Sequence, residues 1–168
     1  MKIIKLLFLF ISISGFSQSK VGTVDIDFIL SNMPELASAQ EQVATYGKGL
    51  DADLNKKFEA YNAVVETYKA EQAGYTEAVK QQKQSEIAVL EEDITKFQQN
   101  GTQLVGIKRD EALRPLYNRI GIALEKVSKA EAFTQVLRID DSIVYMDSNY
   151  DVTLKVLKEL GIEVKEGE

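Results

Sequence analysis

The residues best suited to chemistry in this 168-residue chain are four aspartates near its C-terminal end. Asp140, Asp141, Asp147 and Asp151 could supply carboxylate oxygens to a metal ion, but their spacing matches no calcium loop, and roles in turns and helix caps explain them better. The chain has no Cys and no His, which removes disulfides, thiolate nucleophiles and the commonest general base and metal ligand. We therefore expect no catalytic residue, no metal and no cofactor.

A second set of candidates consists of aromatic residues in the middle of the chain that could contact another protein. Aromatic side chains offer a large apolar surface, and tyrosine adds a polar edge, which suits adaptable contact with an unfolded chain. Packing between helices is the alternative role for each of them. The six residues are Tyr46, Phe58, Tyr61, Tyr68, Tyr75 and Phe97.

The segment that carries these aromatic residues, 35–113, has the composition of long helices rather than of a globular core. Pro34 and Pro115 enclose 80 residues without proline, and Leu, Ile, Val, Phe and Met fill only 17 of the 79 positions in 35–113. The helix formers Ala, Gln, Glu and Lys are abundant there. Apolar residues recur at intervals of three and four, with a four-residue stutter at Leu54 and Phe58. This stripe predicts two long helices that pack along one narrow face.

The stripe fades near the midpoint of 35–113, where we expect the chain to turn. Gly74 could end the first helix and Thr76 could cap the second, so the segment would form a hairpin with its tip near 74–77. A single uninterrupted helix is the alternative. Four glycines weaken the arms and are expected to act as hinges, with tight packing as the alternative: Gly47, Gly49, Gly101 and Gly106.

The two ends of the chain, 18–34 and 114–168, are richer in core residues and are expected to form one split α+β domain. Strong core formers fill 26 of the 70 positions in 20–34 and 114–168. Such a small domain is marginal for a single core, so we expect oligomerisation to stabilise it and to close the edges of its sheet. The pattern predicts strands over 21–28, 134–139 and 143–146, and helices over 115–131 and 152–160, the last one capped by Asp151 and ended by Gly161.

The first 17 residues have the pattern of a secretory signal peptide. Lys2 and Lys5 precede an apolar run, Leu6 to Phe16, which is shorter than the roughly 20 residues of a membrane-spanning helix. Small residues permit cleavage after Ser17, with cleavage after Ser19 as the alternative. We expect an exported protein that is soluble after cleavage. Its net charge of −6 before cleavage argues against nucleic-acid binding.

The order of these pieces resembles the Skp/OmpH family of periplasmic chaperones. The features that carry the resemblance are individually short. They are the signal peptide, the strand Val21-Gly22-Thr23-Val24-Asp25, the Pro34 junction, the long polar helical insert, Leu113-Arg114-Pro115 with the helix after it, the strand pair 136–139 and 143–147, and Asp151-Val152-Thr153 before a terminal helix.

The resemblance implies a homotrimer with a small β-barrel body, built from all three chains, and one long helical hairpin, or tentacle, per chain. The body would comprise 18–34 and 114–168, and the tentacle would comprise 35–113. The cavity between tentacles would hold unfolded outer-membrane β-barrel proteins in the periplasm, so that the protein is an ATP-independent holdase. The implied partners include no nucleic acid, and no stable membrane insertion is implied.

The net charge of this chain is negative, whereas the best-known members of the family are basic. Segment 35–113 has nine basic and 14 acidic residues, a net charge of −5, so we expect clients to be bound through apolar contacts rather than by electrostatic attraction. The alternative function is an exported coiled-coil adaptor that links envelope components, which should carry a distinct patch at the hairpin tip. A cytosolic prefoldin-like chaperone would share the tentacles, but the signal peptide argues against it.

Overall fold

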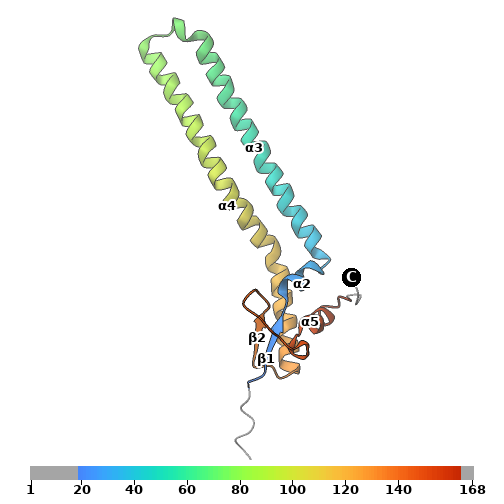
Figure 1. Ribbon diagram of the computed structural model, residues 1–168. Coiled ribbons are helices and arrows are strands. Elements are labelled where there is room, and N and C mark those ends of the chain that lie inside the picture. The colour runs from blue at the N-terminus through green and yellow to red at the C-terminus, as the bar shows by residue number, and fades with distance from the viewer. Residues whose placement is uncertain (1–18, 164–168) are drawn as a thin grey trace, which may run out of the picture. The chain divides into compact units, whose positions relative to one another are not determined.

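The computed structural model describes residues 19–163, which form two compact units. One unit comprises residues 34–115, and the other comprises the described residues up to Met33 and from Leu116 onward. The predicted signal peptide lies outside the described residues. Figure 1 shows the elements in chain order: β1 (Val21–Val24), α2 (Ile26–Ser31), α3 (Glu35–Glu71), η2 (Gln72–Gly74), α4 (Glu77–Ala130), β2 (Gln135–Arg138), η3 (Ser148–Tyr150) and α5 (Thr153–Glu159).

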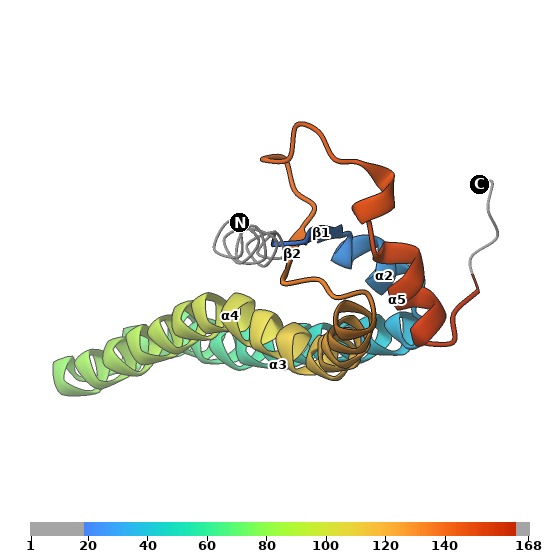
Figure 2. The ribbon, with the colours of Figure 1, turned by 90° about the horizontal axis from the view of Figure 1, so that it is seen from below.

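The helical hairpin is confirmed: α3 and the first part of α4 run side by side in opposite directions (Figures 1 and 2). The short 3₁₀ turn η2 and the extended Tyr75 separate the two helices. The Thr76 hydroxyl then accepts a hydrogen bond of 3.4 Å from the backbone N–H of Val79, as expected of a helix cap. The single uninterrupted helix is therefore excluded.

The predicted start of a new helix at Pro115 is wrong, because α4 continues through this residue. Proline within a helix removes one backbone hydrogen bond and costs about 3 kcal/mol relative to alanine. The helix persists because the turns that follow bury an apolar face at intervals of three and four. The buried residues of this face are Leu116, Ile120, Ala123 and Val127.

The predicted strand 21–28 is wrong beyond Val24, because the chain turns into helix α2 at Ile26. Asp25 causes the change: its carboxylate accepts a hydrogen bond of 2.8 Å from the backbone N–H of Phe28 and so caps α2. Local capping therefore overrides the alternation of apolar residues that continues to Phe28.

The predicted strand 134–139 is confirmed as β2, which pairs in parallel with β1, with Gly22 opposite Val136. The predicted strand 143–146 is wrong for the single chain: these residues lie in a loop that arches out beyond the sheet (Figure 2). The physical reason is that β1 already has β2 on one side and a bridge from Thr23 to Asp151 on the other. The exposed fractions are 97% for Val144 and 85% for Tyr145.

The core of this unit forms where α5 and α2 pack beside β1 and α4. Ile29, Ile120, Val152 and Val156 are almost completely buried. The buried Thr153 fastens these elements, because its hydroxyl accepts a hydrogen bond of 2.8 Å from the Asp25 backbone N–H. The chain then leaves α5 at Gly161, whose φ of +75° suits glycine and ends the helix as predicted.

Gly22 provides a test of this packing. A Cβ atom at Gly22 would lie 2.8 Å from the Phe133 ring and 3.0 Å from the Tyr150 carbonyl oxygen. We expect Gly22→Ala to lower the free energy of unfolding by about 1–3 kcal/mol, because ring and backbone must shift. Urea unfolding followed by circular dichroism measures the change.

The matched control is Gly121→Ala in α4, where a Cβ meets nothing within 4 Å. That variant should be unchanged or more stable by up to about 1 kcal/mol, because alanine favours helix. Equal stability of the two variants would contradict the close approach at Gly22.

Candidate functional site

The candidate site is the surface of the helical hairpin, which exposes most of its side chains. The face along which α3 and α4 pack against each other is narrow. Within 34–115, the buried apolar residues are Ala39 and Ile94. Polar contacts between exposed side chains join the arms toward the tip. Lys57 lies 2.5 Å from Asp93, the Tyr61 hydroxyl donates to Glu91 at 2.6 Å, and Gln84 donates to the Tyr68 hydroxyl at 2.9 Å.

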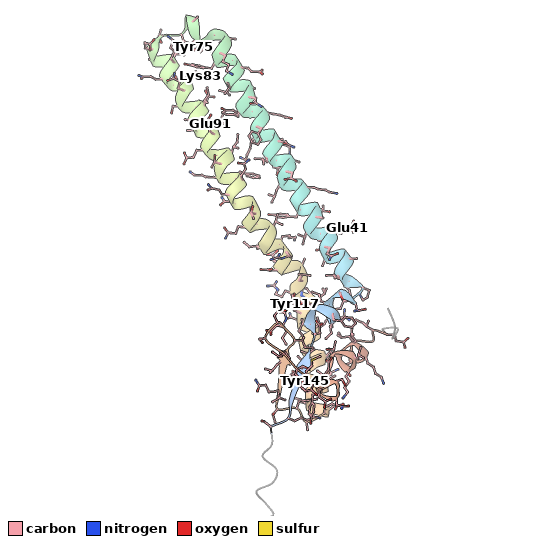
Figure 3. The ribbon with its side chains drawn as sticks, in the orientation of Figure 1. Glu41, Tyr75, Lys83, Glu91, Tyr117 and Tyr145 are labelled. Carbon is pink, nitrogen blue, oxygen red and sulfur yellow. The ribbon has the colours of Figure 1, made fainter. Side chains whose placement is uncertain are left out.

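Three of the predicted aromatic contact residues are tied to neighbours in the hairpin. Besides the bonds of Tyr61 and Tyr68, Tyr75 donates a hydrogen bond of 2.6 Å to Glu71, within the tip region (Figure 3). The rings of Tyr68 and Tyr75 lie 6.3 Å apart. These tyrosines therefore contribute to the hairpin itself while keeping part of each ring exposed.

Phe58 does not lie on the packed stripe as the spacing predicts; it is 37% exposed. Its place is taken by Lys57, whose ammonium pairs with Asp93 and lies 5.2 Å from the centre of the Phe97 ring. Tyr46 is half-buried. The structure spreads the six aromatic residues along the hairpin and does not gather them into one patch.

The predicted hinge glycines fall into two groups. Gly47 on α3 and Gly101 on α4 line a gap of about 430 Å³ between the arms, together with Leu50, Leu54, Phe97 and Val105. Gly49 and Gly106 are not among the residues that line it. The residue pattern alone does not predict this gap. The one indication in the sequence is that antiparallel pairing of Leu54 with Phe97 would also place Gly47 of one arm close to Gly101 of the other.

The aspartates near the C-terminal end act in turns. Asp140 accepts hydrogen bonds from the backbone and hydroxyl of Ser142, which lowers the pKa of the Asp140 carboxyl. Asp147 caps η3 through Asn149, and Asp151 accepts a bond from the Thr153 backbone N–H. In the part of the chain that the structure describes, no group of three or more Asp or Glu side chains is arranged to hold a metal ion.

Among residues 19–163, no helix combines the length and the apolar character needed to cross a bilayer. The hairpin presents an exposed surface along both arms, with few buried side chains. The fold and this surface together define a protein whose candidate site is an extended binding surface on a helical hairpin.

Comparison with known proteins agrees with this architecture. The sequence model of the family described as "Outer membrane protein (OmpH-like)" matches residues 20–160. The crystal structure of a candidate outer membrane chaperone (OmpH-like) from Caulobacter crescentus has the same fold, with a TM-score of 0.66 and 13% sequence identity. The match covers 92% of each chain. No curated protein matches the sequence.

The chain belongs to the Skp/OmpH family of OmpH-like proteins.

The contact between Tyr61 and Glu91 gives a test of the hairpin in solution. Hydrogen bonding to Glu91 raises the pKa of Tyr61 above its ordinary value. The bond needs the protonated phenol, so its stabilisation is present below the unfolded pKa of about 10 and is lost as pH rises through the higher folded value. We expect Glu91→Gln to lower the pKa of Tyr61, as measured by NMR titration of the tyrosine Cζ resonance.

Tyr75 is the internal control, because the hydrogen bond to Glu71 raises its pKa. Glu91→Gln should leave the pKa of Tyr75 unchanged, whereas Glu71→Gln should lower it. A Tyr61 titration that is the same with and without Glu91 would show that the arms are not joined there in solution.

Proposed function

We propose that this protein is an ATP-independent holdase that binds unfolded outer-membrane β-barrel proteins in the periplasm and prevents their aggregation. The observation that carries the proposal is the long hairpin, which exposes apolar and aromatic side chains along a surface that its own fold leaves uncovered. Membership of the OmpH-like family supports it, as does the likeness to the Caulobacter protein described as a candidate chaperone. The signal-peptide pattern supports export to the periplasm.

The exposed side chains of the hairpin support weak and unspecific contact. Leu104 is 38% exposed and Ile107 is 47% exposed, one turn apart on α4. Residues 97–107 contain no charged side chain, so a client's apolar groups would approach this stretch without displacing water from a charge. Many contacts of this kind, each weak, can hold an unfolded chain through their combined avidity.

A homotrimer is part of the proposal. The described residues form a sheet of only two strands, and such a sheet is marginal without further strands. The loop 143–146 exposes Val144 and Tyr145 (Figure 3) and has the β-branched and aromatic composition of a strand. Strands from neighbouring copies would cover these residues and close the sheet edges.

Within such a trimer, the six aromatic residues of the hairpin would be client contacts, and Gly47, Gly49, Gly101 and Gly106 would let the arms bend. An added Cβ at any of these glycines meets nothing within 4 Å, so close packing does not require them. Their helix-weakening effect is the property that the proposal uses. The adaptor alternative has less support, because the tip tyrosines bond to their own neighbours.

The holdase activity can be tested by diluting a urea-denatured outer-membrane β-barrel protein into buffer with the purified, processed chain and following light scattering. We expect aggregation to be suppressed at one trimer per client without nucleotide. Leu104→Glu with Ile107→Glu should weaken suppression, because both substitutions remove exposed apolar surface. Suppression should depend only weakly on salt, since the hairpin has a net charge of −5.

The matched control is Gln99→Glu with Gln103→Glu, which adds the same charge to exposed positions of the same helix without loss of apolar surface. This control should retain activity. No suppression by the unaltered chain would favour the adaptor, and a steep loss of affinity with salt would contradict binding through apolar contacts.

The trimer can be tested by light scattering with size-exclusion chromatography. We expect the unaltered chain to have three times the mass of one chain, and Val144→Asp with Tyr145→Asp to lower that mass, because charges cannot be buried between copies without a partner. Val89→Asp is the control, since Val89 is 61% exposed on the hairpin. A monomeric unaltered chain would refute the trimer, and an unchanged mass of the double variant would remove 143–146 from its interface.

A further inference from the structure

The gap between the hairpin arms, which Gly47 and Gly101 line, is bordered mainly by apolar groups. Its volume of about 430 Å³ falls within the range of sites that bind small ligands. Leu50, Leu54, Phe97 and Val105 line it with apolar groups. The Phe97 ring, which lines the gap, lies 5.2 Å from the Lys57 ammonium, and Lys57 pairs with Asp93 of the opposite arm.

Each arm has a glycine, Gly47 or Gly101, in the lining of the gap, so neither position contributes a side chain to it. An added Cβ at Gly47 or Gly101 would meet nothing within 4 Å, so neither glycine is imposed by a close contact of the backbone. Alanine would favour each helix by about 1 kcal/mol. The two glycines therefore lower the stability of the hairpin and leave space that the hairpin does not use.

The chemistry of the lining selects the occupant. Asp51 is the one charged residue among those that line the gap, and the hairpin as a whole is acidic, which disfavours fatty acids and other anions. The lining has few polar groups beyond Gln98 and Thr102, which disfavours polar metabolites. A neutral apolar side chain on an extended peptide fits both conditions, and peptide N–H groups or a basic neighbour would suit Asp51.

We propose that this gap is a subsite that takes one aromatic or branched aliphatic side chain of an unfolded polypeptide between the two arms. The inference rests on the proposed holdase function and adds a defined site to it. Each hairpin then binds a client along its exposed surface and also takes one of the client's side chains into the gap. The hairpin therefore prefers client segments with large apolar residues.

The test uses the processed full chain and two neutral, end-capped peptides of Gly, Ser and Thr, one with a central Phe and one with Ala in its place. Methyl resonances of Leu50, Leu54 and Val105 report binding in an NMR titration. We expect the Phe peptide to shift them and to bind at least about tenfold more tightly than the Ala peptide, as burial of a phenyl ring implies. Equal shifts with both peptides, or none with either, would overturn the proposal.

Filling the gap provides matched variants. Gly101→Leu and, independently, Gly47→Leu should abolish the preference for the Phe peptide while leaving the chain folded. Gly106→Leu adds the same side chain to the same helix away from the gap and should keep the preference. Loss of the preference in Gly106→Leu, or its retention in both filled variants, would refute the subsite. If a filled variant does not fold, the comparison of the two peptides on the unaltered chain still decides.

Two further measurements separate the alternatives. Decanoate in place of the peptides tests an acyl chain as occupant, and tighter binding of decanoate than of the Phe peptide would overturn the proposal. Suppression of aggregation by the unaltered chain is measured separately. If suppression is present but the Phe preference is absent, the subsite fails and the holdase stands; if suppression is absent, the holdase itself fails.

Discussion

The structure of the hairpin depends on one constraint: two helices that pack only against each other can bury no more than one stripe of each. The interior of the hairpin is therefore thin, and stability must come from helix formers, from short side-chain ties such as Lys57 with Asp93, and from the turn at η2. The same constraint leaves the remaining faces of α3 and α4 open to solvent. A protein that binds other chains along its length can use this uncovered surface.

Features that depend on composition and periodicity could be predicted from the sequence. The hairpin, its turn and the helix that ends at Gly161 follow from helix formers, spacings of three and four, and glycine at a positive φ. The strand β2 follows from a short run with apolar residues such as Val136 and Leu137, bounded by turn residues. The order of these short pieces indicates the family.

Features that depend on competition between local and tertiary forces were predicted wrongly. Alternating apolar residues up to Phe28 favour a strand, but the Asp25 carboxylate accepts a hydrogen bond from the Phe28 backbone N–H and so caps α2. Pro115 favoured a helix boundary, but burial of the Leu116 and Ile120 face carried α4 through it. The gap at Gly47 and Gly101 could not be predicted, because a list of residues does not say what space the opposite arm leaves.

The parallel register of β1 and β2 has a consequence for how the chain reaches its native state. Gly22 pairs with Val136, so the sheet joins residues that lie on either side of the whole hairpin in the sequence. The entropy of closing so long a loop makes this pairing slow if the intervening chain is unfolded. Formation of the hairpin first, from local contacts around its turn, shortens the effective loop. During synthesis, which begins at the N-terminus, β1 therefore stays unpaired until β2, residues 135–138, has been made.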